Sequence, residues 1–192
     1  MLRKLAVLFT FLPGFVPRAA LACACCADPG TRFQEVSELG AWEISEIAAL
    51  APTSPARLYQ SACGLDCVGG ITDPQTAYDV AMEVTETGLA FVLSDGRGPR
   101  GALTFPWPET YTWFAVDTAL DGKGDPQVYT ELRFRGALAA TGDFAQDGPV
   151  AAELVLSGFG NVCITRQSFD GWMLSVSDDS AQFRLFGTLS ER

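Results

Sequence analysis

Apolar and polar side chains alternate in several runs after residue 76, and this alternation constrains the fold more than any other feature of the sequence. Successive side chains of a β-strand point to opposite faces, so a period of two predicts a strand with one buried face. The clearest alternating runs are residues 78–84, 128–135, 172–177 and 183–189, and further strand-like runs are residues 89–93, 111–116 and 150–156.

Asp-Gly pairs punctuate these runs, and Asp-Gly is favoured in the tight turns of antiparallel hairpins. They occur at Asp95-Gly96, Asp121-Gly122, Asp147-Gly148 and Asp170-Gly171. About eight short strands joined by such turns predict an all-β, mainly antiparallel fold. We expect an up-and-down β-barrel or a β-sandwich.

The segment before residue 76 has a different pattern. The spacing of Val36, Leu39, Ile44 and Ile47 predicts a short N-terminal helix over residues 35–48, and the alternative is a strand that begins near Trp42. Residues 58–62 are expected to form a strand. We therefore divide the mature chain into a cysteine-containing segment, residues 23–75, packed on an antiparallel β-domain, residues 76–192, the two forming a single domain.

The first 22 residues have the three parts of a secretory signal peptide. Arg3 and Lys4 precede an apolar run, residues 5–16, and small residues, Ala20 and Ala22, precede Cys23. The apolar run is shorter than the roughly 20 residues that a membrane-spanning helix needs. We expect cleavage before Cys23 and export to the periplasm or the extracellular space.

A lipoprotein anchored at Cys23 is the alternative, because Cys23 would be the first residue of the mature chain. Bacterial lipoprotein signals resemble this arrangement, but they usually carry leucine three residues before the cysteine. That position holds Ala20, and Leu21 comes one position late. The pattern favours cleavage without lipidation.

The charge of the chain excludes one class of partner. Cleavage removes three basic residues and no acidic one, so the net charge changes from −10 to −13. A field of this sign repels phosphate backbones, and the sequence has no basic cluster to counter it. We expect no nucleic-acid partner.

Six cysteines remain after cleavage, and in an oxidising compartment an even count predicts structural disulfides. Adjacent Cys25 and Cys26 are not expected to bond to each other, because such a ring strains the peptide between them. At least one of them should pair with a cysteine further along the chain. The candidates for disulfides are Cys23, Cys25, Cys26, Cys63, Cys67 and Cys163.

A metal site is the alternative for the same residues, since several sulfurs gather within a few residues. In the absence of histidine, thiolates would suit Cu(I) or Zn(II). The candidate ligands are Cys23, Cys25, Cys26, Cys63 and Cys67.

Catalysis is not expected. The sequence contains no histidine, so it has no Ser-His or Cys-His pair. A glycosidase-like carboxylate pair such as Glu131 with Glu153 depends on spatial separation, which the sequence leaves open. The favoured function is a non-catalytic β-domain that binds a small molecule or an envelope protein, with no cofactor.

Gly40-Ala41-Trp42, followed by Glu43-Ile44, resembles the Gly-x-Trp motif that opens the first strand of lipocalins. The resemblance covers this motif and the succession of antiparallel strands. It implies binding of a small hydrophobic ligand inside a barrel, with Trp42 closing the base. Of the family's other usual marks, a Thr-Asp-Tyr-like loop motif has no secure match, and Arg184 is a conceivable but not a secure counterpart of the late arginine that packs on the tryptophan. The expected helix over residues 35–48 competes with this interpretation.

Overall fold

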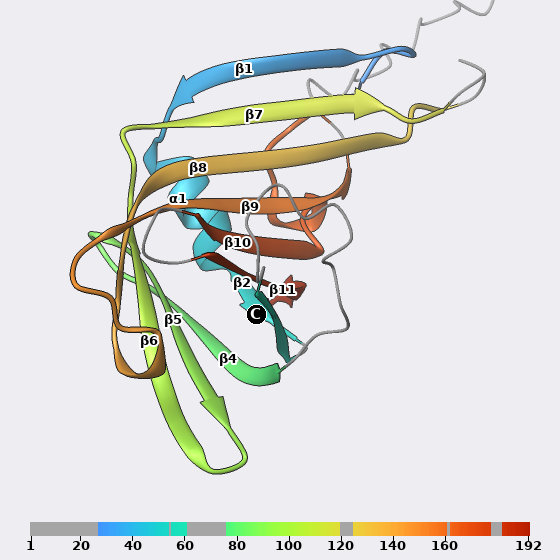
Figure 1. The fold of residues 1–192 in the computed structure, drawn as a ribbon. Helices are drawn as coiled ribbons and strands as arrows, with labels where there is room; N and C mark the ends of the chain where they lie inside the picture. Colours follow the sequence, from blue (N-terminus) through green and yellow to red (C-terminus); the bar gives the residue numbers. More distant parts are fainter. Residues whose placement is uncertain (1–26, 54, 61–75, 120–124, 161, 178–181) are drawn as a thin grey trace, which may run out of the picture.

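The computed structural model describes residues 27–53, 55–60, 76–119, 125–160, 162–177 and 182–192, and it forms a closed antiparallel barrel of eight strands (Figure 1). Around the barrel the strand order is β8-β6-β5-β4-β3-β11-β10-β9, and pairing of β8 with β9 closes it. The predicted all-β class is confirmed, with a barrel rather than a sandwich. The barrel strands are β3 (Ala56–Gln60), β4 (Thr76–Val84), β5 (Gly88–Asp95), β6 (Gly98–Pro106), β8 (Val128–Ala140), β9 (Val150–Gly160), β10 (Gly171–Ser177) and β11 (Gln182–Glu191).

Two further strands extend the sheet away from the barrel. The first half of β8 pairs with β7 (Thr110–Asp117), and only the end of β8, at Ala139 and Ala140, pairs with β6. β7 in turn pairs with β1 (Arg32–Glu38). In Figure 1, β1, β7 and β8 follow one another at the top of the view, while the β5–β6 hairpin projects downward. A short strand, β2 (Leu50–Pro52), pairs with the end of β11.

Large apolar side chains fill the interior of the barrel. Phe91 stacks on Trp172 with ring centroids 5.1 Å apart, and the ring centroids of Phe134 and Tyr111 lie 6.0 Å apart. An eight-stranded barrel is just wide enough for such side chains to fill. The alternation within the predicted runs is confirmed, because its apolar members face this core. The largest fully buried side chains include Phe91, Phe105, Phe134, Leu89, Leu93, Leu103, Leu132, Leu138, Leu154 and Leu156.

The predicted helix over residues 35–48 is right only in its second part. The structure has α1 at Ala41–Ala48, after a strand, β1, at Arg32–Glu38. β1 forms because it pairs along its length with β7, where Phe33 packs edge-on against Trp113 at 4.8 Å. Such long-range pairing overrides a local helical spacing. α1 begins after Gly40, whose N–H donates to the Glu43 carboxylate at 3.1 Å.

The Asp-Gly pairs serve different connections. Asp95-Gly96 lies in the β5–β6 turn, where the Asp95 carboxylate accepts the Arg97 N–H at 2.7 Å. Asp147-Gly148 precedes β9, after the 3-10 helix η2 (Gly142–Phe144), and Asp170-Gly171 leads from η3 (Arg166–Ser168) into β10. Asp121-Gly122 lies outside the described residues. The strand expected at residues 58–62 is β3, and β6 is a strand that the sequence did not predict.

Within the described part of the chain, no helix has the length and the apolar character needed to cross a membrane.

Candidate binding face

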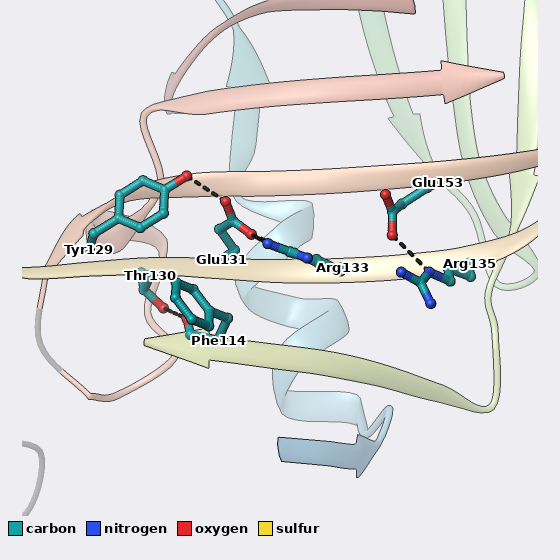
Figure 2. Close-up of polar contacts among 7 residues, drawn as sticks. All are labelled: Phe114, Tyr129, Thr130, Glu131, Arg133, Arg135 and Glu153. Atoms are coloured by element: carbon teal, nitrogen blue, oxygen red, sulfur yellow. Dashed lines mark hydrogen bonds and ion pairs between the residues drawn. The ribbon is translucent and has the colours of Figure 1, made fainter. Parts of the chain in front are cut away.

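The site is on the outside of the sheet formed by β1, β7, β8 and β9, which we call the outer face. Along β8 the even-numbered side chains from Val128 to Phe134 are buried, so the odd-numbered ones point outward. Figure 2 shows these outward side chains, Tyr129, Glu131, Arg133 and Arg135, in a row along β8.

Glu131 is held by both of its neighbours on this row. The Tyr129 hydroxyl donates to Oε1 of Glu131 at 2.6 Å, and the Arg133 guanidinium pairs with Oε2 (Figure 2). Burial, and then the hydrogen bond to Glu131, raise the pKa of Tyr129 to about 12. Both carboxylate oxygens are therefore engaged, and Tyr129 stays protonated near neutral pH.

Aromatic rings cross the outer face from strand to strand. Tyr129 lies between Phe114 of β7, with centroids 6.5 Å apart, and Phe159 of β9, at 5.5 Å. The Arg133 guanidinium lies 5.8 Å from the centre of the Phe114 ring. Phe159 is 58% exposed. Because neighbouring rings are steeply inclined, Phe114, Tyr129 and Phe159 form an uneven apolar strip rather than a flat stacking surface.

The charges of the outer face balance. Arg135 pairs with Glu153 across β8 and β9 at 2.8 Å, beside the Glu131–Arg133 pair (Figure 2). On β1, Arg32 and Glu38 point to the same side of the sheet as Gln34, which lies opposite Phe114 of β7. The outer face is thus neutral, whereas the whole chain has a net charge of −10. Its charged residues are Arg32, Arg133, Arg135, Glu38, Glu131 and Glu153.

The structure does not bring together the carboxylate pair that the sequence left open. In the β8–β9 register Glu131 lies opposite Ser157, and Glu153 lies opposite Arg135, four residues further along the strand. Four residues of strand span about 13 Å, more than the roughly 5–9.5 Å that separate the carboxyl groups of glycosidases. Each carboxylate also has its own arginine, Arg133 or Arg135.

Of the six predicted cysteine sites, the structure describes one. Cys163, in the β9–β10 connection, is disulfide-bonded, and no other cysteine lies in the described ranges. Those ranges hold no group of three or more potential metal ligands. The candidate ligands and disulfide partners Cys23, Cys25, Cys26, Cys63 and Cys67 lie outside the described residues.

The lipocalin-like motif does not occupy the position that the resemblance implied. Trp42 is in α1 rather than at the start of a strand, and it is 60% exposed. Its indole N–H donates to the carbonyl of Ile164 at 3.0 Å, so it fastens α1 to the β9–β10 connection. Arg184 lies on β11, where it donates to Ser175 at 2.9 Å. The likeness is therefore one of general barrel shape.

The sequence has five aromatic residues between positions 105 and 114, and the structure divides them between the core and the outer face. Phe105 and Tyr111 are buried, and Trp107 and Trp113 pack against the core. Phe114 is the member that reaches the outer face. Its contacts with Tyr129 and Phe159 were missed from the sequence, although the alternation of residues 128–135 already placed Tyr129 outward.

Comparison of the chain with protein-family models, with curated proteins and with solved structures finds no match.

Proposed function

We propose that the mature protein is an exported, non-catalytic β-barrel domain that binds an envelope protein through the outer face. The observation that carries this proposal is the aromatic strip, Phe114, Tyr129 and Phe159, set in a charge-neutral surface of an otherwise acidic chain. Aromatic and arginine side chains are enriched where protein surfaces meet, and they supply much of the binding energy.

The filled interior favours a protein partner over a small ligand. Phe91, Phe105 and Phe134 are completely buried inside the barrel, where a ligand would have to be accommodated. The outer face, in contrast, offers Phe159 to solvent without any rearrangement. Its paired charges also lower the cost of docking, because Glu131 keeps Arg133 and Tyr129 as partners when water is removed.

Photo-crosslinking in the producing cells tests this proposal. A photoreactive phenylalanine analogue at position 159 is expected to form a discrete adduct with one envelope protein. The same analogue at Glu83, an exposed position on β4, is the matched control and should form none. An adduct of equal yield at both positions, or no adduct at position 159, would contradict the proposed face.

Once the adduct identifies the partner, Phe159→Ser is expected to weaken binding about 30-fold, since an aromatic side chain that carries binding energy at an interface is typically worth about 2 kcal/mol. Isothermal titration calorimetry measures the affinity. The melting temperature should change little, because Phe159 is largely outside the core. An affinity unchanged by the substitution would remove Phe159 from the site.

The proposed export has its own test. Intact-mass measurement of the mature protein is expected to show a chain that begins at Cys23 with an unmodified amine. A mass increased by a diacylglycerol group would establish the lipoprotein alternative. In the same sample, several free thiols together with bound copper or zinc would favour the metal-binding alternative over structural disulfides.

A further inference from the structure

β1 is the outermost strand of the described sheet. Its seven residues pair with β7 on one side, and no described strand pairs with the other side. Figure 1 shows β1 as the last ribbon at the top of the sheet. An unpaired strand edge presents backbone N–H and C=O groups that can hydrogen-bond to another strand.

The hydrogen bonds at the two ends of β1 show which residues present these groups. The Asp117 N–H donates to the Thr31 carbonyl at 2.7 Å, and the Leu39 N–H donates to the Glu109 carbonyl at 3.0 Å. Backbone groups of alternate residues point to opposite sides of a strand, so odd-numbered residues face β7. The even-numbered residues of β1, from Arg32 to Glu38, therefore direct their N–H and C=O groups to the open edge.

Val36 stands near the middle of this edge. It is 66% exposed, more than any other large hydrophobic side chain in the described residues. Its backbone N–H and C=O groups also point to the open edge of β1. An apolar, β-branched residue with outward backbone groups is suited to strand pairing, where a partner side chain would cover it.

We propose that β1 pairs with β1 of a second copy of this chain, antiparallel, about a two-fold axis at Val36. Val36 then lies opposite its own counterpart, and Gln34 lies opposite Glu38 of the other copy. On the other side of the strand Glu35 lies opposite Ser37, and Phe33 lies opposite Leu39. No like charges face each other directly in this register.

A shift of the axis to Glu35 is disfavoured. An axis at Glu35 would place the two Glu35 carboxylates directly opposite each other, and like charges in that position are destabilising. The axis at Val36 also buries the more exposed apolar side chain. Because the outer face of each copy is neutral, pairing about the two-fold axis places two neutral faces side by side and adds no charge repulsion between them.

The net charge of each copy opposes association at long range, and salt screens this repulsion. Sedimentation equilibrium of the purified protein, between micromolar and millimolar concentrations, is expected to show a monomer–dimer equilibrium that shifts toward dimer as salt is added. A monomer at every concentration and salt level would overturn the proposal.

Engineered cysteines test the register. Residues opposite each other in a hydrogen-bonded antiparallel pair have Cα atoms about 5.5 Å apart, within the range of a disulfide. Val36→Cys is expected to form a covalent dimer on mild oxidation, identified by peptide mapping. Gln34→Cys alone should not, whereas a mixture of Gln34→Cys and Glu38→Cys chains should cross-link to each other. Cross-linking of Gln34→Cys to itself, without cross-linking of Val36→Cys, would overturn the register.

Val36→Pro separates self-association from folding. The Val36 N–H points away from β7, so its loss leaves the β1–β7 hydrogen bonds in place. The variant is expected to remain folded by circular dichroism and to be monomeric at every concentration. A Val36→Pro chain that stays folded and dimerises as well as the natural chain would refute pairing through β1.

Discussion

Replacing Cys163 with serine is expected to lower the melting temperature by roughly 10 °C. Cys163 is disulfide-bonded, and a bridge to the N-terminal cysteines would close a loop of more than 100 residues. A cross-link of this length stabilises a protein by about 4 kcal/mol in the chain-entropy model. In a domain of this size, 1 kcal/mol corresponds to about 2–4 °C.

The topology indicates which cysteines can reach Cys163. The Gly30 N–H donates to the Asp117 carboxylate at 2.9 Å, and Asp117, Val128 and Gly160 are opposite one another on β7, β8 and β9. The chain therefore enters the sheet at the end where the β9–β10 connection leaves it. Cys26 precedes Gly30 by four residues, close enough to span the three intervening strand spacings of about 4.8 Å each.

Cys63 is a poor candidate by the same argument. It comes three residues after Gln60. Gln60 pairs with Phe183 of β11, Phe183 pairs with Val176 of β10, and Val176 pairs with Ala152 of β9. Ala152 is eight residues from Gly160 along β9, or about 26 Å, while the three residues after Gln60 reach about 10 Å. We therefore expect Cys163 to pair with Cys23, Cys25 or Cys26 rather than with Cys63.

Differential scanning calorimetry of the oxidised protein measures the effect of Cys163→Ser, and peptide mapping identifies the partner. The reduced natural chain is the control, and it should melt near the reduced variant. If Cys163→Ser leaves melting unchanged but abolishes retention of copper or zinc, the structural interpretation of this cysteine is wrong.

The second large effect is expected at Arg166. Arg166→Met should destabilise the protein by about 3 kcal/mol, because it leaves Glu46 buried without its cation. Glu46 is 4% exposed; its Oε1 accepts from the Arg166 guanidinium at 2.9 Å, and its Oε2 accepts from the Arg166 backbone N–H at 2.7 Å. This pair ties α1 to the β9–β10 connection, so its loss should loosen both.

The same pair predicts a pH dependence. The hydrogen bond from the Arg166 side chain holds the pKa of Glu46 below its usual 4.5. A carboxylate whose pKa is lowered on folding stabilises the native state fully above the unfolded value, and the stabilisation is lost as the pH falls below about 4.5. In Arg166→Met this acid-dependent loss should become smaller, which melting curves between pH 3 and 7 would show.

Arg135→Met is the matched control for both measurements. It breaks the Arg135–Glu153 pair, in which the arginine side chain is 76% exposed, and exposed pairs contribute about 0–1 kcal/mol. Equal destabilisation by Arg135→Met and Arg166→Met would show that burial of Glu46 contributes nothing to the strength of its ion pair.

The β-rich character of this protein, and the side of each alternating run that faces the core, follow from the sequence alone. In residues 128–135 the alternation was sufficient to place Leu132 inside and Arg133 outside, because neighbouring side chains of a strand must point to opposite faces. The all-β class was predictable for the same reason.

Pairing between distant strands was decided by the tertiary structure. Residues 32–38 form a strand only because β7, nearly 80 residues later, supplies the hydrogen bonds, and a local pattern carries no record of such a partner. The same holds for the outer face, where Phe114, Tyr129 and Phe159 come from three strands. Their contacts depend on register, and register is set by the closure of the whole barrel rather than by any one segment.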